Sequence, residues 1–390
     1  MKILHIMNYY QENMGYQENW LPYYQKELDY EVLILTSDKY FPFPNYEDNV
    51  GKILGDRIKG EGVFFDKDVK IIREKSFLEI SSKAIVLFKV KSIIENFNPD
   101  AIHLHGITNL NLFSVLWCIK DKKIKLFIDS HSDYQVSNYK SIFNKLYYKI
   151  WSNIYKIFDK KINLYLPTTK EGQKFIVNEF KINIDKTEVN YLGVNSDNFY
   201  YDENAKELLV KKYNLENKIV IINAGKQYEG KKIDFIIQVV KELVTKFKRE
   251  DIALILIGNA SKEYERIIQY ESQNILEHIT RISFLENKLL KDYYSLADIG
   301  IWPGIPSNTI QEAMACEVSI ILPTNDTTSH LIDNNGFFIK EFDAELVAKN
   351  INDLIKNSLL EKYKHMSRKI VSKYSWKEIA KQSLEIYENY

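Results

Sequence analysis

The run IVIINAGKQYEGKKIDFII, from Ile219 to Ile237, decides the fold class. It opens on a nearly continuous apolar stretch, which is typical of a strand buried on both faces of a parallel sheet. A polar turn with two glycines follows, and from Ile233 the apolar spacing becomes that of an amphipathic helix. Strand, turn and helix in this order form the repeating unit of doubly wound α/β sheets.

The same unit recurs on both sides of this run. Strand-like apolar stretches follow it at 252–258, 281–285, 298–303 and 318–323, and others precede it at 2–7, 31–37, 100–105, 125–130 and 162–167. Each is followed by a polar turn or a helical pattern. We therefore predict an α/β protein with two Rossmann-like, doubly wound domains that face each other across a cleft.

The length of 390 residues also favours two domains, because one hydrophobic core seldom organises so long a chain. The turn-rich, polar segment 186–218 separates the two strand series, and the pattern after 341 is purely helical. We predict an N-terminal domain at 1–187 and a C-terminal domain at 188–368. A terminal helix at 369–390, with an apolar stripe on Trp376, Ile379, Leu384 and Ile386, is expected to pack on the N-terminal domain.

Composition narrows the class of partner. Lys plus Arg equals Asp plus Glu at 53 each, which removes the general positive charge on which nucleic-acid binders rely. The two cysteines, Cys118 and Cys316, lie far apart in apolar runs, so neither a disulfide framework nor a metal knuckle is indicated. Neither a signal-peptide pattern nor an apolar run long enough for a membrane span is seen, and a cytoplasmic location is expected.

The turn after the strand at 219–225 is predicted to bind a diphosphate. A strand-to-helix junction collects free backbone N–H groups at the positive end of a helix, and Gly225, Lys226 and Lys231 suit a phosphate there. Lys232 stands where a nucleotide-triphosphate loop would need Ser or Thr for Mg²⁺. We therefore expect no metal.

A second polar turn leads into a helix within Trp302–Cys316. Ser307, Asn308 and Thr309 are candidates for the helix N-cap, and Glu312 lies in the turn that follows. Ligands of open α/β sheets bind at the carboxyl ends of the strands. A carboxylate at this place suits the paired hydroxyls of a ribose, and the capping groups suit its phosphates.

The first half offers fewer candidates. Gly15 follows the first strand and allows close approach of a phosphate, and His131 follows the strand at 125–130, where it could contact a sugar or assist proton transfer. We expect His103 and His105 to face opposite sides of their strand and to be structural. The triplet 66–68, Asp-Lys-Asp, is interpreted as a hairpin turn rather than a metal site.

The segment 139–161 holds six lysines and one aspartate among Phe, Tyr, Trp and Ile residues. Two interpretations are open. A basic amphipathic helix can lie on an anionic membrane, which would give a peripheral contact at the inner face of the membrane. Alternatively, it is a crossover helix with solvated lysines.

Taken together, these residues resemble the retaining glycosyltransferases of family 4, which have the two-domain GT-B fold. The ordered motifs are the opening KILHI with Gly15, PDAIHLHG at 99–106, IDSH at 128–131, LGVNSDNF at 192–199, the Gly225 turn with its basic pair, SLADIGIWP at 295–303 and QEAMA at 311–315. The resemblance implies that Glu312 holds the donor ribose and that Phe284 and Leu285 line the base. It implies that Lys226 and Lys231 stabilise the leaving diphosphate, with help from Gly15 and 307–309, and that His131 contacts the donor sugar or the acceptor.

One position departs from that family. Its signature has two glutamates eight positions apart, and Gly304 stands in place of the first, which normally contacts the donor sugar. Ser307, Asn308 and backbone N–H groups would then take over that contact. The expected activity is retaining transfer from a nucleoside-diphosphate sugar to a glycan or lipid-linked hydroxyl, in cell-surface polysaccharide or glycolipid synthesis.

Three alternatives remain open. A nucleotide-sugar 2-epimerase of similar architecture would need no acceptor. A two-lobed sugar-binding protein is disfavoured by the missing signal-peptide pattern. A catalytically weak nucleotide-sugar-binding scaffold is kept open by Gly304.

Overall fold

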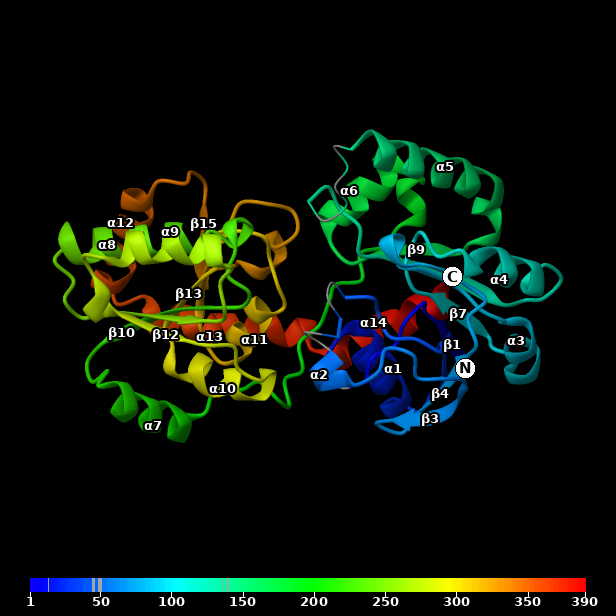
Figure 1. The fold of residues 1–390 in the computed structure, drawn as a ribbon, viewed down its shortest axis with the longest axis horizontal. Helices are drawn as coiled ribbons and strands as arrows, with labels where there is room; N and C mark the ends of the chain where they lie inside the picture. The colour runs from blue at the N-terminus through cyan, green and yellow to red at the C-terminus, as the bar shows by residue number, and fades with distance from the viewer. Residues whose placement is uncertain (13, 44–45, 48–50, 136, 138, 140) are drawn as a thin grey trace. The chain divides into compact units, whose positions relative to one another are not determined.

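The computed structural model describes residues 1–12, 14–43, 46–47, 51–135, 137, 139 and 141–390, and the chain divides into two compact units (Figure 1). The first unit joins Met1–Leu192 to Trp376–Tyr390, and the second is Gly193–Ser375. Both divisions lie a few residues after the boundaries that the sequence suggests, 187/188 and 368/369. The C-terminal segment belongs to the first unit, as expected of a helix that returns to the N-terminal domain.

The first unit is an α/β layer structure. Its strands are β1 Lys2–Ile6, β2 Glu31–Ser37, β3 Gly62–Asp66, β4 Val69–Glu74, β5 Leu78–Ile80, β6 Ile85–Leu87, β7 Ala101–Leu104, β8 Lys125–Ser130 and β9 Leu164–Pro167. Its helices are α1 Gln17–Glu27, α2 Gly51–Leu54, α3 Lys91–Phe97, α4 Asn111–Ile119, α5 Ile142–Phe158, α6 Lys170–Glu179 and α14 Trp376–Asn389. Short 3-10 turns lie at Ser81–Lys83, Asp159–Lys161 and Ile184–Lys186.

Seven of these strands form one sheet in the order β3-β4-β2-β1-β7-β8-β9. All neighbours are parallel except β3 and β4, which form an antiparallel hairpin. Lys67 and Asp68 turn that hairpin with φ of 46° and 64°, which confirms the interpretation of 66–68 as a hairpin turn. The central strands β1, β7 and β8 are almost wholly buried, because helices cover both faces.

Helix α14 completes the first unit. The four residues of the predicted apolar stripe, Trp376, Ile379, Leu384 and Ile386, are all buried. The helix lies against α1, and Leu384, Ile386 and Tyr387 join a core cluster with residues of β1, β7, β8 and β9 (Figure 1). Burying this stripe against one face of the sheet stabilises the unit through the hydrophobic effect.

The second unit is a second doubly wound sheet. Its strands are β10 Ile219–Ala224, β11 Ile252–Ile257, β12 Ile279–Ile282, β13 Ile299–Ile301, β14 Ser319–Pro323 and β15 Gly336–Ile339. Its helices are α7 Glu203–Tyr213, α8 Ile233–Thr245, α9 Lys262–Ser272, α10 Asn287–Leu296, α11 Thr309–Ala315, α12 Ala344–Lys356 and α13 Leu360–Val371. Short 3-10 turns lie at Glu229–Lys231, Leu276–His278, Ser329–Leu331 and Ser372–Tyr374.

All six strands run parallel in the order β12-β11-β10-β13-β14-β15. The chain thus winds from β10 to β12 at one side and then returns through β13 to β15 at the other. The order reverses between β10 and β13, and the crevice at such a reversal is where open α/β sheets bind ligands. The two predicted doubly wound sheets are confirmed.

Three details differ from the sequence-based expectations. The segment 186–218 contains helix α7, whose N-cap is the Asp202 side chain, although its polar composition suggests only turns. Strand β12 is Ile279–Ile282 rather than 281–285. The short strand β15 was not expected. Among the described helices, none has both the length and the apolar character required to cross a membrane.

Candidate functional site

A pocket of about 580 Å³ lies at the carboxyl ends of the strands in the second unit. Its wall is built from the turn after β10, the turn after β11, the segment between β12 and α10, and the start of α11. The lining residues are Gly225, Lys226, Gln227, Tyr228, Ile257, Gly258, Asn259, Ala260, Ser261, Phe284, Leu285, Asn287, Leu290 and Thr309. Five predicted site residues are therefore brought together: Gly225, Lys226, Phe284, Leu285 and Thr309.

Two glycines allow the floor of this pocket to form. Gly225 and Gly258 follow β10 and β11 with φ of 138° and 131°, a region that side chains rarely tolerate. A Cβ built on Gly258 would overlap the carbonyl of Gly225, whose carbon would be 2.9 Å away. The backbone N–H of Gln227 donates to the Asn259 carbonyl oxygen at 3.1 Å and ties the two turns together. The two turns thus approach closely at the floor of the pocket, where neither glycine has a side chain.

The opposite wall carries an exposed aromatic ring. Phe284 is 68% exposed, and its backbone N–H donates to Asn259 Oδ1 at 3.2 Å. Leu285 beside it is partly buried and packs on the core of the unit. An aromatic ring that is fixed by its backbone and open to solvent offers a surface for stacking a flat ring.

Glu312 sits on α11 with an incomplete set of partners. Its Oε1 accepts a hydrogen bond from Asn287 Nδ2 at 3.0 Å, whereas Oε2 is buried and has no hydrogen-bond partner among the described residues. Burial raises the pKa of Glu312 to about 7, although the bond from Asn287 acts in the other direction. A buried acceptor without a hydrogen-bond donor lowers the stability of the fold. This oxygen is therefore suited to accept a hydrogen bond from a hydroxyl group of a ligand.

The two lysines of the turn differ in environment. Lys226 lines the pocket and is exposed, whereas Lys231 is half-buried and is absent from the pocket lining. The Lys231 ammonium donates a hydrogen bond to the Ile305 carbonyl oxygen at 2.7 Å and a longer one to the Pro306 carbonyl oxygen at 3.5 Å. Burial lowers the pKa of Lys231, and the partners of its ammonium among the described residues are these carbonyl oxygens rather than a carboxylate.

Gly304 packs directly on this turn. A Cβ built on Gly304 would overlap the carbonyl oxygen of Gly230 and would lie 2.6 Å from the Lys231 Cα. The backbone N–H of Ile305 also donates to the Gly230 carbonyl oxygen at 2.9 Å. Glycine is therefore required at 304 by the contact between two backbone segments, and no glutamate fits there.

The segment Ser307–Thr309 is tied into the fold. The Ser307 and Thr309 hydroxyls lie 2.7 Å apart, and the Thr309 hydroxyl donates to the Ala224 carbonyl oxygen at 3.2 Å. Asn308 occupies the N-cap position of α11, but its side chain makes no capping hydrogen bond. The N-cap predicted for this segment is thus correct in position at Asn308 and wrong in its side-chain bond. Ser307, Asn308 and Glu312 are not among the residues that line the pocket.

Comparison with known proteins gives a family match within this unit. Residues 205–373, nearly all of the second unit, match the family model described as Glycosyl transferases group 1. The second unit is thus similar to the domains of that family. The pocket and Glu312 both lie within the matched residues.

Relatives extend the likeness beyond the residues that match the family model. An uncharacterized glycosyltransferase of Methanocaldococcus jannaschii is 26% identical over 246 residues, which are 60% of this chain and 58% of that protein. The chain thus spans less than two thirds of that relative. A second relative, from Campylobacter jejuni, is N-acetylgalactosamine-N,N'-diacetylbacillosaminyl-diphospho-undecaprenol 4-alpha-N-acetylgalactosaminyltransferase. It is 20% identical over 318 residues, 80% of this chain and 82% of that protein.

The whole chain also has the fold of solved glycosyltransferases. The crystal structure of Anabaena HepE in complex with UDP superposes with a TM-score of 0.73, at 13% identity and with all of both chains covered. The predicted GT-B fold is confirmed.

In the first unit, the two predicted site residues lie in turns that follow strands. Gly15 precedes α1 with φ of 73°, a value that favours glycine. His131 follows β8 directly, and its side chain is 43% exposed, with Nε2 3.9 Å from Asp129 Oδ2. Both positions are at the carboxyl edge of the seven-stranded sheet. Their predicted roles toward a ligand stay predictions.

Beside His131 lies a buried network that the sequence interpretation missed. Asp129 is fully buried and accepts the Gly106 backbone N–H at 2.7 Å, with His103 Nε2 at 3.2 Å and His105 Nδ1 at 2.7 Å. Burial alone would raise the pKa of Asp129, but His105 and His103 bring it well below its usual range. The network continues from His105 to His5 Nδ1, at 2.9 Å, and from His103 to the Tyr387 hydroxyl.

The expectation that His103 and His105 face opposite sides is wrong. Their rings stack in parallel with centroids 4.3 Å apart. Residues two apart on a strand point to the same face, so the parity of the positions should have placed them together. The expectation of a structural role agrees with their burial and their bonds.

The pocket also contains residues that sequence reasoning did not single out. Gln227, Gly258, Asn259 and Asn287 line it, and Asn287 is the partner of Glu312. Gly258 and Asn259 end an apolar strand, as Gly225 does, so the rule that ligands bind at strand ends could have identified them. No comparable signal marks Asn287, because its contact with Glu312 depends on how α10 packs beside α11.

Proposed function

We propose that this protein transfers a sugar from a nucleoside-diphosphate sugar to a hydroxyl of a glycan or lipid-linked acceptor. The observation that carries the proposal is Glu312, whose buried Oε2 has no hydrogen-bond donor among the described residues and which lies beside a pocket of suitable size. A ribose offers two adjacent hydroxyls, and one of them would supply that donor. The match of the second unit to the glycosyltransferase group 1 family supports this interpretation.

The remaining parts of the pocket fit the rest of a nucleotide. Phe284 and Leu285 would hold the base, since the exposed Phe284 ring offers a stacking surface. The backbone at Gly225 and the Lys226 ammonium would face the diphosphate. UDP is the nucleotide in the HepE complex, which makes a UDP sugar the first donor to test.

Lys231 would add charge where the leaving diphosphate becomes more negative. Its ammonium is half-buried with only carbonyl partners, so an anion beside it would be favoured more than in water. Fixed positive charge placed where negative charge develops lowers the barrier of such a reaction. We propose that Lys226 and Lys231 act in this way without a metal, and that transfer proceeds with retention.

The donor sugar would be contacted differently from the pattern of family 4. Because Gly304 has no room for a side chain, we propose that Ser307 and Asn308 contact the sugar or its phosphate. His131 is proposed to contact the donor sugar or the acceptor, and Gly15 to approach the phosphates through its backbone. With these assignments, the segment 304–309 would determine which donor sugar the protein binds.

The acceptor is proposed to be part of a cell-surface polysaccharide or glycolipid pathway. The Campylobacter relative is named for transfer onto a diphospho-undecaprenol carrier, which is a lipid-linked acceptor. On helix α5, exposed lysines alternate with exposed apolar residues, as a contact with an anionic membrane requires. We therefore propose that the protein acts at the cytoplasmic face of a membrane through 139–161, of which residue 140 lies outside the described residues.

The test is turnover of a panel of UDP, GDP and CMP sugars with and without EDTA, with products identified by NMR. Release of nucleoside diphosphate and a new glycosidic bond supports the proposal, and undiminished turnover in EDTA supports metal independence. Glu312→Ala should weaken donor binding, whereas Glu286→Ala, which removes an exposed carboxylate nearby, should not. A rearranged free sugar would indicate an epimerase. Binding without turnover would indicate a scaffold, and the absence of any nucleotide binding would refute all three.

A further inference from the structure

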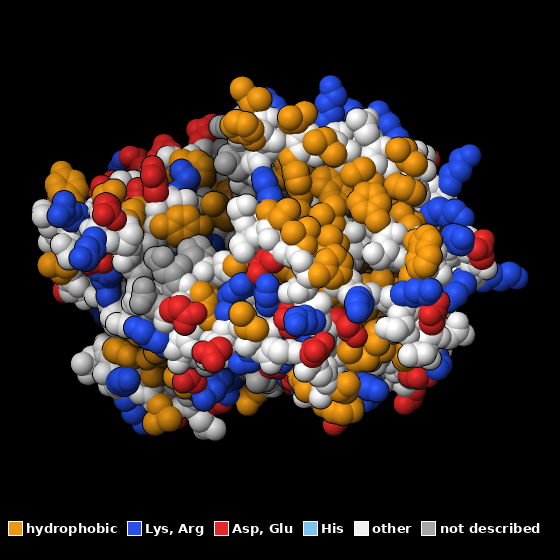
Figure 2. Space-filling view, turned by 45° about the vertical axis from the view of Figure 1, so that its right-hand side comes forward, with side chains coloured by type: hydrophobic (Ala, Val, Ile, Leu, Met, Phe, Trp, Pro, Cys, Tyr) orange, Lys and Arg blue, Asp and Glu red, His pale blue; other side chains and the backbone are white. Residues whose placement is uncertain are grey.

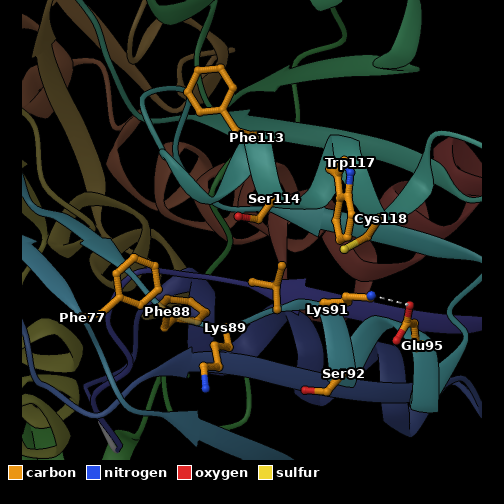
Figure 3. A pocket seen from close by; sticks show the side chains of 11 residues that line it. Phe77, Phe88, Lys89, Lys91, Ser92, Glu95, Phe113, Ser114, Trp117 and Cys118 are labelled. Atoms are coloured by element: carbon orange, nitrogen blue, oxygen red, sulfur yellow. Dashed lines mark ion pairs between the residues drawn. The ribbon is translucent and has the colours of Figure 1, made fainter.

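An apolar groove of about 680 Å³ opens on the surface of the first unit, between helix α4, the start of α3 and the β5–β6 hairpin (Figure 3). Helix α4 forms one side with Phe113, Trp117 and Cys118. Phe77 and Phe88, which flank the hairpin of β5 and β6, lie on the other side. Phe88 is buried at the base, whereas Phe77 and Trp117 are 66% and 58% exposed. Exposing large aromatic side chains around an open groove to water is unfavourable in free energy, and such exposure is typical of a binding site.

The groove lies beside helix α5. The Phe113 ring lies 6.4 Å from that of Trp151 and 6.0 Å from that of Phe158, so α4 packs beside α5. On the hairpin side, the Lys83 ammonium donates to Asn144 Oδ1 at 2.8 Å. Both sides of the groove thus reach the same helix.

Helix α5 presents unusually exposed apolar side chains. Its buried face carries Tyr148, Trp151, Ser152 and Tyr155. The other face exposes Ile142 and Phe143 by 81% and 83%, followed by Leu146 and Ile150. Figure 2 shows hydrophobic side chains gathered over this part of the first unit, with lysine and arginine side chains around them. We refer to Phe77, Phe113, Trp117, Ile142, Phe143 and Leu146 as the apolar patch.

The charge around the apolar patch is positive. Exposed lysines lie on α5 and at the groove, at 145, 149, 156 and 89. The nearby carboxylates already have cationic partners: Glu95 lies 3.8 Å from Lys91, and Asp159 lies 3.1 Å from Lys186. Because the whole chain has no net charge, this excess of positive charge is particular to the surface around the apolar patch. Lysines around exposed aromatic and aliphatic side chains match the surface of an anionic membrane.

We propose that the groove between α4 and the β5–β6 hairpin binds one hydrocarbon chain of a lipid, while α5 lies on the anionic membrane that contains it. This inference rests on the proposed membrane contact and adds a specific lipid-binding site to it. Trp117 would lie at the level of the headgroups, where tryptophan is favoured, and Phe77 and Phe113 would enclose the chain. The acidic headgroups would face the lysines of α5.

Tryptophan fluorescence tests the groove directly. Of the five tryptophans in the chain, Trp151, Trp302 and Trp376 are buried, and Trp20 is partly buried under the Lys67 ammonium. Trp117 is the most exposed of them. Anionic phosphatidylglycerol vesicles with brominated acyl chains should therefore quench the protein. Quenching should fall to roughly the level of unbrominated vesicles in Trp117→Phe and should persist in the matched variant Trp20→Phe.

A thiol reagent gives a second measurement on unaltered protein. Cys118 lines the groove and is partly exposed, whereas Cys316 is fully buried. Maleimide should therefore modify Cys118, and phosphatidylglycerol vesicles should slow that reaction several-fold. Zwitterionic phosphatidylcholine vesicles should slow it less, because they lack the negative charge that attracts the lysines.

The outcomes separate the parts of the proposal. Sedimentation with anionic vesicles, without quenching of Trp117 and without protection of Cys118, would refute the groove and leave the contact through α5. Failure to sediment with any vesicle would refute both, and a protein partner would then have to cover the apolar patch. Nucleotide binding measured on the same sample reports on residues that are not part of the groove, so neither failure would be mistaken for failure of the proposed reaction.

Discussion

Raising the pH from about 6 to about 8 should tighten the binding of a nucleotide sugar by about tenfold. Glu312 has a pKa raised to about 7 by burial, and the proposed ribose contact requires its ionised form, which only accepts hydrogen bonds. With that pKa, about one eleventh of the side chains are ionised at pH 6 and about ten elevenths at pH 8. The ratio corresponds to about 1.4 kcal/mol of binding free energy.

The sign follows from the direction of the shift. A hydroxyl that donates to the carboxylate favours the charged form, so binding lowers the pKa of Glu312 and releases a proton. For folding the sign is opposite. The raised pKa of this acid means that its ionisation costs stability as the pH rises from the unfolded value toward about 7. Tighter binding at high pH would therefore accompany slightly lower stability of the free protein.

Isothermal titration calorimetry between about pH 6 and pH 8 measures the affinity and the release of a proton on binding. The ligand should be an intact nucleotide sugar, because its diphosphate has no proton to lose in this range. Glu312→Gln should remove the pH dependence, and Glu286→Gln, an exposed carboxylate paired with Lys288, should keep it. Asn287→Ala removes a bond that lowers the pKa of Glu312, so its midpoint should move to higher pH. A dependence that survives in Glu312→Gln, or an affinity that does not vary with pH, would refute the assigned role.

Three further changes test other parts of the structure. Gly304→Ala should lower the stability of the second unit by about 1–3 kcal/mol, because the added Cβ overlaps Gly230; an unchanged thermal midpoint would contradict this packing. Lys231→Met should weaken donor binding by about tenfold or more, since a charged hydrogen bond contributes about 1.5–3 kcal/mol, and equal titration curves would contradict the diphosphate role. Asp129→Asn should destabilise the first unit by about 3–5 kcal/mol near neutral pH, as judged by urea unfolding. Because the pKa of Asp129 is depressed, the wild type should lose this stabilisation as the pH falls through the folded value, and a variant as stable as the wild type near neutral pH would refute it.

Much of the fold follows from local patterns in the sequence. Buried parallel strands are short, continuous apolar runs, so β10, β11 and β14 could be located from composition alone. The edge of each sheet where ligands bind follows from strand direction. That rule places Gly225 and Phe284 in one pocket, although they are far apart in sequence.

The parts that the sequence did not predict depend on contacts between distant segments. Gly304 looked like a missing glutamate, whereas its packing against Gly230 shows that two backbone segments meet there. The one hydrogen bond that the described residues give the Glu312 carboxylate likewise comes from Asn287, on a different helix. Helix α7 was overlooked because its charged residues resemble a loop, and none of its residues is buried. Charge patterns alone do not separate an exposed helix from a polar turn.

The packing of helix α14 on the first unit has a consequence for how the chain folds during synthesis. Domains emerging from the ribosome generally fold in order from the N-terminus. Here, Trp376–Tyr390 is translated after the whole second unit, yet it covers apolar residues of β1 and β8 and supplies the Tyr387 hydroxyl to His103. Until Trp376–Tyr390 has been translated, part of the core of the first unit therefore stays uncovered and its histidine network stays incomplete, so an interruption of synthesis before this segment would leave the earliest-made unit unfinished.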